Sequence, residues 1–511
     1  QRLHRAAAAG PQLPFGRDVP VLMRALLPML LAALAASTCA HAAQTLQLQG
    51  TLTGKDHQHY LELPFAVPDG TGRVDVTLQH DGGDERTVVD LGLLDAQGFR
   101  GWSGGSRRAI SVSRYDASGG YLPGAMPAGQ WKVLLGVPNI RARVQTPYNV
   151  SVTLWSEDEV QAGRDRKPLV LRDEAAWYRG DLHMHSTHSD GSCSSQQGNK
   201  VACPLFLSLQ AAVRQGLDFV AVTEHNTISH LDELARHQPW FDRLLLIPGM
   251  EVTTFQGHAN VFGVNGPLPF RLGDTLPDWN PLLREVNNSG ALLSINHPAL
   301  PSGEDCMGCG WTPARPVDMA AVGAVEVVNA RQADGPRSGV GFWEQQLQQG
   351  RRMTAIGGSD SHNPGAADGP SPIGLPATLV HASALSREAI LAAIRQGRVV
   401  VDVDNVAASG LELWLQGDAG TRAEMGQQLD LPAGQWATLH TQLDYPRRLK
   451  IEFVVDGRRY PTTVEVDANG SQRASLRWRS DGQRHWLRVD ARDADGSLRM
   501  LGNPVYVNWP Q

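Results

Sequence analysis

Long apolar runs and cysteines are both scarce in this chain of 511 residues. The one long apolar run, residues 25–36, follows Met23-Arg24 and precedes Ala40-His41-Ala42, which has the A-x-A pattern of a signal-peptidase site. This run is too short for a retained membrane span. We therefore predict that residues 1–43 are a spurious upstream extension followed by a signal peptide that begins at Met23. Cleavage near Ala42-Ala43 would leave a periplasmic or secreted chain with no membrane span.

An excess of positive charge is also missing. The chain has 46 Lys and Arg against 52 Asp and Glu, a formal net charge of −6. Residues 1–43 contain four Arg and one Asp, so their removal changes the net charge from −6 to −9. Such a surface repels phosphate backbones, which excludes nucleic acid as the expected partner. A small-molecule substrate is the partner that we expect instead.

Only four cysteines remain outside the predicted signal peptide. An even number in an exported protein favours disulfides over free thiols. Pairing of sequence neighbours would join Cys193 to Cys203 and Cys306 to Cys309, but cross-links between the two segments are equally compatible with the sequence. A four-cysteine zinc site is the rival interpretation, because Cys306-x-x-Cys309 has suitable ligand spacing.

No internal repeat or low-complexity linker divides the chain, so its domains must be inferred from changes in hydrophobic rhythm. A chain of this length is expected to form about two to four domains. Residues 44–165 and 405–511 alternate polar and apolar residues in short runs broken by turns, which predicts two β-sandwiches. Residues 170–402 instead alternate short apolar runs with helical segments that stop at Gly, as at Gly216 and Gly290, and this favours a parallel sheet with helices.

Polar residues with metal-binding side chains follow several of the apolar runs in the central segment. Glu224-His225 follow residues 219–222, and His297 follows residues 292–295. In barrel enzymes the active site forms at the carboxyl ends of the parallel strands. We therefore expect these side chains to meet at one end of the sheet.

The pattern His183-x-His185 is the clearest metal-binding signal. Residues two apart on an extended strand project to the same side, so both imidazoles can bind one ion. Imidazole and carboxylate ligands without thiolate suit Zn, Mn or Fe. A carboxylate such as Glu251 can bridge two ions, and two ions would lower the pKa of a shared water enough to make it a nucleophile.

Two motifs resemble the PHP (polymerase and histidinol phosphatase) superfamily, in its carbaryl-hydrolase-type (CehA/McbA-like) branch. They are Tyr178-Arg179-Gly180-Asp181-Leu182-His183 and Gly357-Gly358-Ser359-Asp360-Ser361-His362. The resemblance covers residues 178–400. It implies an α/β fold, a distorted (β/α)7 TIM-like barrel, here flanked by two β-sandwich domains, with two or three divalent metal ions.

The resemblance also implies a ligand set for each ion. The first ion would be held by His183, His185, Glu251 and Asp360. The second would be held by Glu251, His258 and His297. The third would be held by Asp190, His225 and His362.

The chain departs from the superfamily pattern at one position. Family members carry Asp before the histidine of the second motif, where this chain has Glu224. At the third ion His188 is the alternative to Asp190. A metal-bound water is the predicted nucleophile, with His188, Glu224 and Asn329 as assisting residues. Glu326 and Asn329 end another strand and are candidates for orienting the ligands or the substrate.

These observations predict an exported metal-dependent hydrolase that directs a metal-activated hydroxide at an ester, carbamate or amide bond. The branch resemblance alone suggests that substrate class. One alternative is a phosphoesterase of the PHP type. Another is a non-catalytic metal- or glycan-binding surface protein, since two β-sandwiches and 13 Trp suit glycan binding or self-association.

Overall fold

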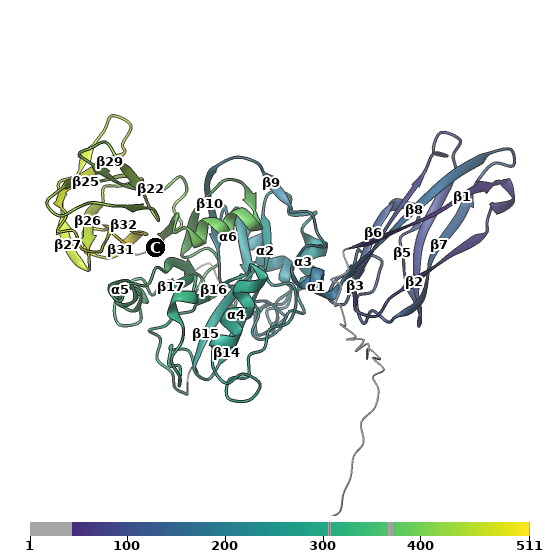
Figure 1. The fold of residues 1–511 in the computed structure, drawn as a ribbon, viewed down its shortest axis with the longest axis horizontal. Helices are drawn as coiled ribbons and strands as arrows, with labels where there is room; N and C mark the ends of the chain where they lie inside the picture. Colours follow the sequence, from purple (N-terminus) through teal and green to yellow (C-terminus); the bar gives the residue numbers. More distant parts are fainter. Residues whose placement is uncertain (1–42, 305, 307, 366–368, 370, 510–511) are drawn as a thin grey trace, which may run out of the picture. The chain divides into compact units, whose positions relative to one another are not determined.

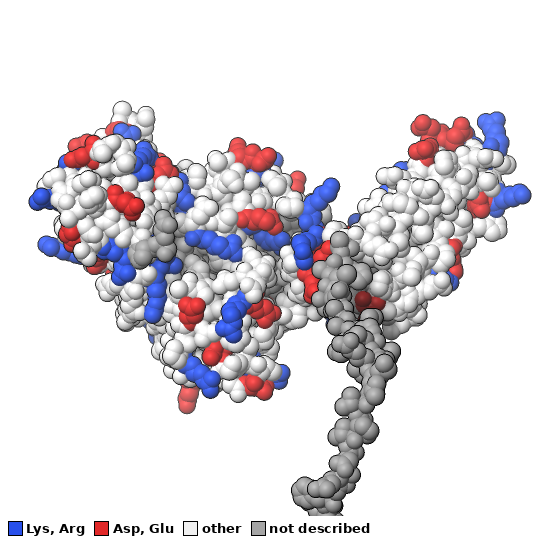
Figure 2. Space-filling view, viewed as in Figure 1, with Lys and Arg blue, Asp and Glu red and all other residues white. Residues whose placement is uncertain are grey.

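The computed structural model describes residues 43–509, apart from 305, 307, 366–368 and 370 (Figure 1). These residues belong to one compact unit. The predicted signal peptide lies outside them. None of the described helices combines the length and the apolar character needed to cross a membrane. On the face shown in Figure 2, basic and acidic side chains are interspersed among uncharged ones.

The N-terminal part consists of two antiparallel four-stranded sheets that share one apolar core (Figure 1). Alternate residues are buried, as in β3, where Val74, Val76 and Leu78 face inward, and Trp131 fills the core from β7. The first sheet contains β1 (Gln44–Thr53), β8 (Gln145–Ser156), β3 (Thr71–His80) and β6 (Ala109–Ser113). The second contains β2 (Tyr60–Val67), β7 (Gly129–Asn139), β4 (Val88–Asp95) and β5 (Gly98–Trp102).

The largest sheet has 15 strands and runs through the central and C-terminal parts of the chain. Its central strands are buried on both faces, as their continuous apolar sequences require. The central strands are, in spatial order, β18 (Thr354–Gly358), β17 (Ala324–Asn329), β16 (Leu292–Ile295), β15 (Gly257–Phe262), β14 (Leu245–Thr254), β13 (Phe219–Val222), β10 (Ala176–Asp181), β19 (Ala377–Ala382) and β21 (Val399–Asp402). The sheet then continues through β31 (Leu498–Gly502), β30 (His485–Arg492), β26 (Lys450–Val455) and β27 (Arg458–Pro461), with β32 (Val505–Val507) beside β30 and β24 (Gln428–Leu429) beside β32.

Six α-helices occur in the described part of the chain. Gly290, with φ of 78°, supplies the left-handed residue that ends α4. The helices are α1 (Glu157–Gln161), α2 (Leu205–Arg214), α3 (Leu231–His237), α4 (Asn280–Ser289), α5 (Val340–Gln348) and α6 (Arg387–Arg395). The remaining elements are β9 (Val170–Arg172) with β20 (Leu385–Ser386), β11 (Ser192–Ser194) with β12 (Lys200–Ala202), and the 3-10 turns Gly54–Asp56, Gly104–Ser106 and Met319–Ala321.

The predicted α/β fold, a distorted (β/α)7 TIM-like barrel flanked by two β-sandwich domains, is wrong. Strands predominate, and the large sheet is mixed, because β15 is antiparallel to its neighbours β14 and β16 and β19 is antiparallel to its neighbours β10 and β21. β14 turns directly into β15 at Phe255-Gln256, so no helix separates them. In addition, β31 pairs with β21 over Val400–Asp402, so the central sheet continues into the C-terminal strands instead of ending before them.

The predicted parallel pairing is present in the strands that position the polar residues. β10, β13 and β14 are parallel neighbours, and so are β16, β17 and β18. Isolated parallel bridges join Met184 to Ser361 and His225 to Glu251, just beyond these strands. The segments that follow β10 and β18 therefore meet, and the carboxyl ends of the parallel strands surround one region.

The C-terminal part adds a five-stranded sheet that shares its apolar core with the end of the large sheet. Its strands are β23 (Arg422–Glu424), β22 (Gly410–Gly417), β25 (Trp436–Asp444), β29 (Gln472–Arg479) and β28 (Glu465–Val466). The predicted boundaries at residues 165, 402 and 405 stay a prediction.

Within this part, Asp490 is fully buried among three arginines. Its carboxylate contacts Arg488, lies 2.6 Å from Arg459 Nη1 and lies 3.4 Å from Arg492 Nη2. Burial acts to raise the pKa of Asp490, but the guanidinium groups of Arg488 and Arg492 and the hydrogen bond from Arg459 lower it overall. The carboxylate is therefore charged in the folded protein and compensates buried positive charge.

We expect Asp490→Asn to lower the free energy of unfolding by about 3–5 kcal/mol, because it removes one of the two carboxylates that contact the fully buried Arg488 and leaves only Glu344. A depressed pKa stabilises the fold above the unfolded value of about 3.9, and this stabilisation is lost as the pH falls through the folded value. Urea unfolding followed by Trp fluorescence at pH 7 and below pH 4 should show the largest difference at pH 7. Asp173→Asn, at an exposed position, is the control, and an equal loss in both variants would contradict the prediction.

Candidate metal centre

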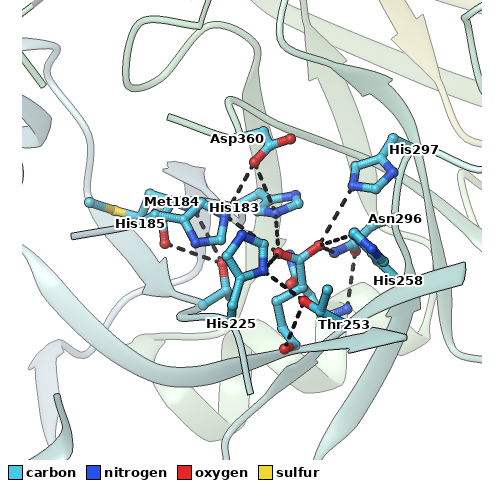
Figure 3. A network of polar contacts seen from close by, with 12 residues as sticks. His183, Met184, His185, His225, Thr253, His258, Asn296, His297 and Asp360 are labelled. Atoms are coloured by element: carbon cyan, nitrogen blue, oxygen red, sulfur yellow. Dashed lines mark hydrogen bonds and ion pairs between the residues drawn. The ribbon is translucent and has the colours of Figure 1, made fainter. Parts of the chain in front are cut away.

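The structure brings all nine predicted ligands together beside the carboxyl ends of the parallel strands. Figure 3 labels six of them, His183, His185, His225, His258, His297 and Asp360. Local backbone placement explains this convergence, because most of them sit at or just beyond a strand end. His183 and His185 follow β10, Asp190 precedes β11, His225 follows β13, Glu251 lies in β14, His258 lies in β15, His297 follows β16, and Asp360 and His362 follow β18.

Glu251 and Asp360 approach the same two imidazoles. Glu251 Oε2 lies 3.4 Å from His183 Nε2 and 3.5 Å from His185 Nε2, and Asp360 Oδ1 lies 3.3 Å and 3.2 Å from these nitrogens. Ligands about 2.0–2.2 Å from a tetrahedral ion are about 3.3–3.6 Å apart, whereas charge-assisted hydrogen bonds measure about 2.7–2.9 Å. Each carboxylate therefore has ligand spacing to both imidazoles, and His183, His185 and Glu251 together could hold one cation.

Unsatisfied polar atoms support the same interpretation. His183 Nε2 is buried and has no hydrogen-bond partner among the described residues, and Glu251 Oε2 is buried with no well-aligned hydrogen bond, although His225 Nδ1 lies 2.8 Å from it. A buried polar atom without a partner costs about 1–3 kcal/mol. A divalent cation between these atoms would remove that cost, so the residues present fit a metal ion.

The other carboxylate oxygen of Glu251 faces a second pair of histidines. Glu251 Oε1 lies 3.2 Å from His258 Nδ1 and 3.6 Å from His297 Nε2, and it accepts a hydrogen bond of 2.9 Å from Asn296 Nδ2 (Figure 3). The ligand atoms of His258 and His297 also come within 4.8 Å of one on Cys309, a residue that the sequence suggested as a metal ligand only in a four-cysteine zinc site.

A third group is more exposed. His185, Asp190, His225 and His362 each offer a ligand atom within 4.8 Å of the others, and Asp190 Oδ1 lies 3.2 Å from His362 Nε2. The side chain of Asp190 is 58% exposed. Burial acts to raise the pKa of Asp190, but the nearby His362 and His225 lower it to about 2. Burial likewise acts to lower the pKa of His362, but Asp190 and Asp360 raise it to about 9.

The buried charges stabilise each other strongly. Burial opposes ionisation of Glu251, but His183 and His225 hold its pKa well below the ordinary value. Burial acts in the same way on Asp360, whose pKa is held well below the ordinary value by His183, His185 and His297. The pKa of His183 is raised well above its ordinary value by Asp360, Glu326 and Glu251, although burial lowers it. The site thus contains carboxylates that require positive charge beside them.

Glu326 contacts two of the predicted ligands, His183 and His297, and reaches a third, Asp360, through Asn329. Because a carboxylate only accepts, its Oε1, 3.0 Å from His183 Nδ1, holds a proton on that nitrogen, so a cation that replaces the other proton would bind His183 through Nε2, beside Glu251 and Asp360. Its Oε2 accepts hydrogen bonds from His297 N at 2.9 Å and from Asn329 Nδ2 at 3.2 Å. Asn329 Nδ2 also lies 3.2 Å from Asp360 Oδ2.

Backbone conformation is unusual at two predicted ligands. His297 has φ of 27° and Asp360 has φ of 53°, both in the left-handed region that disfavours residues with a Cβ. Such conformations cost about 1–3 kcal/mol each and persist where the surroundings enforce them. The hydrogen bond from His297 N to Glu326 is one contact that holds this conformation.

The three predicted assisting residues lie in different surroundings. His188 binds Ser229 Oγ and Glu233 Oε2, both at 2.8 Å, and belongs to none of the metal-ligand groups found in the described residues. Glu224 is fully buried and accepts hydrogen bonds from the Ser186 and Ser189 hydroxyls. Asn329 bridges Glu326 and Asp360, as described above. Asp190, not His188, therefore joins the third group.

Sequence patterns missed two features of the site. His230, which the sequence patterns did not single out, precedes the first residue of α3 and is fully buried, and burial lowers its pKa to about 4. Thr253 Oγ1 lies 2.6 Å from His225 Nδ1 and orients that ring. A threonine two residues after a glutamate in a strand gives no signal for such a contact.

The disulfides join Cys193 to Cys203 and Cys306 to Cys309, which is the pairing of sequence neighbours.

Comparisons with known proteins give limited information. No family model and no curated protein matches the sequence. A solved two-domain protein from Bacteroides vulgatus ATCC 8482, described as containing a predicted PHP-like metal-dependent phosphoesterase, is 18% identical with a TM-score of 0.35, over 66% of this chain and 99% of that chain. A family two carbohydrate esterase from Cellvibrio japonicus is 10% identical with a TM-score of 0.17, over 68% and 96% of the two chains. At these TM-scores neither likeness assigns a function.

Proposed function

We propose that this chain is an exported metal-dependent hydrolase of the PHP type. The observation that carries the proposal is the fully buried Glu251 carboxylate, which lies 3.2–3.6 Å from four imidazoles, two of which lie equally close to Asp360. Structural ion pairs do not need this many buried imidazoles, because each buried polar group adds a desolvation cost. A cluster of divalent cations, Zn, Mn or Fe, accounts for the donor set.

When bound, the ions would lower the pKa of a water and polarise the bond that it attacks. The exposure of the ligand side chains indicates which side of the site is open to solvent. His183, His185 and Glu251 are fully buried, whereas the side chains of Asp360, His225 and His362 are 21%, 27% and 36% exposed. A substrate therefore reaches the site from the side of these three residues.

We propose an ester, carbamate or amide as the substrate. In the part of the chain that the structure describes, the polar contacts of the nine predicted ligands include no Lys or Arg side chain. Phosphate groups are commonly bound by such cations. Their absence from these contacts favours an uncharged carbonyl group over a phosphate monoester.

A substrate panel tests the proposal. The purified chain, as isolated, after dialysis against a chelator and after return of Zn or Mn, is assayed with aryl acetates, aryl carbamates and aryl phosphates. We expect hydrolysis of an acetate or carbamate to fall on chelation to the rate of the His183→Ala variant and to return with metal. Preferred hydrolysis of aryl phosphates would instead show a phosphoesterase. Bound metal without turnover of any substrate would support the binding-protein alternative and contradict this proposal.

A further inference from the structure

A loop that carries a disulfide covers the second pair of histidines. Cys309 lies in the segment that connects β16 to β17, and its carbonyl lies 3.1 Å from His297 Nδ1. Two backbone hydrogen bonds hold the segment in place, from Trp311 N to the Pro298 carbonyl at 3.1 Å and from Thr312 N to the Gln256 carbonyl at 3.0 Å. Cys309 is therefore fixed beside the site by the backbone on its C-terminal side, independently of its disulfide partner.

The sulfur of Cys309 lies within reach of a metal ion bound by His258 and His297. One ligand atom from each of these three residues lies within 4.8 Å of the others. The three residues are 4%, 5% and 3% exposed, in the order Cys309, His258, His297. A thiolate and two imidazoles form a donor set that suits zinc.

The two imidazoles present free nitrogen atoms for such an ion. Because a carbonyl only accepts, the Cys309 carbonyl fixes the proton of His297 on Nδ1 and leaves its Nε2 lone pair available. His258 Nδ1 faces Glu251, while its buried Nε2 has no hydrogen-bond partner in the described part of the chain. A buried nitrogen without a hydrogen-bond partner is costly, so His258 Nε2 is a second observation, besides Cys309, that points to a bound ion here.

We propose that Cys309 is a redox-dependent metal ligand, an inference that rests on the metal centre proposed above. In the disulfide with Cys306 the Cys309 sulfur carries no negative charge and is a poor ligand. In the dithiol form its thiolate joins His258 and His297 on a zinc-like ion. The thiol state of the chain thereby sets whether a thiolate is among the donors beside His258 and His297, and the thiolate favours zinc over manganese.

The reaction that switches the ligand is balanced by a dithiol reductant. The two thiols of the reductant form a disulfide, the Cys306–Cys309 bond breaks, and two electrons and two protons pass to the cysteine sulfurs. Cys309 then releases its proton to solvent as the sulfur binds the ion. In an oxidising compartment the chain keeps the disulfide and the all-imidazole and carboxylate site.

The chain offers a matched control for this switch. The second disulfide, Cys193–Cys203, joins β11 to the end of the β11–β12 hairpin, and neither cysteine belongs to a metal-ligand group found among the described residues. Reduction of this disulfide alone is expected to leave metal binding unchanged. Any effect that requires Cys309 can thus be separated from general disulfide loss.

Cobalt substitution of the full chain tests the proposal. The metal-free protein is prepared in oxidised form and in dithiol-reduced form with the reductant removed, and each is loaded with Co²⁺ without oxygen. A near-ultraviolet thiolate-to-cobalt band is expected in the reduced protein and absent in the oxidised protein. Cys306→Ser should show the band without reductant, because its Cys309 is always free, and Cys309→Ser should never show it. The Cys193→Ser/Cys203→Ser variant should behave as the unmodified chain does.

Two results would overturn the inference. Visible cobalt bands without the near-ultraviolet band, in both the reduced chain and Cys306→Ser, would show a metal centre that excludes Cys309. A near-ultraviolet band that survives Cys309→Ser would place the thiolate elsewhere. Failure of the chain to bind cobalt in any state would instead reject the metal centre itself, and with it this inference. The reduced unmodified chain keeps the test valid if Cys306→Ser does not fold.

Discussion

Glu251→Gln is expected to lower kcat/KM for the preferred substrate by about a thousandfold and to reduce the bound metal per chain. Divalent ions contribute several kcal/mol of transition-state stabilisation, and each 1.36 kcal/mol corresponds to about tenfold in rate. Glutamine keeps the volume of the side chain and one oxygen, but it removes the negative charge that faces His183 and His185 on one side and His258 and His297 on the other. Metal content by elemental analysis and steady-state kinetics are the two measurements.

Glu285→Gln is the control for this experiment. Glu285 lies exposed on α4, so its substitution removes the same charge without touching the site. The control should keep full metal content and activity. Full metal content and nearly unchanged kcat/KM in Glu251→Gln would contradict the role proposed for this carboxylate.

Short-range patterns in the sequence predicted the position of most polar residues of the site. The spacing of His183 and His185 follows from the period of an extended strand, and both rings do face Glu251. His225, His297 and Asp360 lie at the ends of β13, β16 and β18, where a parallel sheet gathers its C-terminal residues. Local geometry determines where a residue lies relative to the end of its strand, so these positions can be predicted from a single sequence.

The fold was less predictable than the site, because it depends on pairing between strands that are far apart in the sequence. The residues of β14 and β15 form one hairpin around Phe255-Gln256, although their apolar runs resemble two strands of a βα repeat. The pairing of β21 with β31 joins residues about one hundred positions apart, and no local pattern specifies it. A prediction from hydrophobic rhythm therefore replaced a mixed sheet of 15 strands with a closed parallel barrel and separate sandwiches.

Contacts behind the ligands were also hard to foresee. Glu326 lies in the middle of Val325-Glu326-Val327, a strand sequence in which an acidic residue normally marks a solvent-facing position. In the structure it is 2% exposed and contacts His183, His297 and Asn329. The burial of Glu326 depends on histidines that follow two other strands. The sequence alone therefore indicates only that Glu326 is a candidate for orienting ligands.

Glu326→Gln is expected to weaken metal binding by about 10–100-fold, the usual effect of removing a group that orients a ligand. The carboxylate offers an acceptor oxygen to both His183 Nδ1 and the His297 amide, whereas glutamine has only one acceptor oxygen. In the variant one of these donors must face an NH₂ group. Either His183 takes the tautomer that places its proton on Nε2, or the positive φ of His297 loses its hydrogen bond.

The Zn²⁺ dissociation constant, from competition with a chromophoric chelator, measures the loss directly. Glu326→Ala should weaken binding at least as much as Glu326→Gln and should also lower the free energy of unfolding by about 1–3 kcal/mol for each unpaired buried donor. Asn329→Ala removes the contacts to Glu326 and Asp360 but leaves both histidines hydrogen-bonded to Glu326, so it should cause a smaller loss. A merely structural Glu326 would lower the free energy of unfolding and leave the Zn²⁺ dissociation constant of the folded protein unchanged, and that result would reject its role in positioning the ligands.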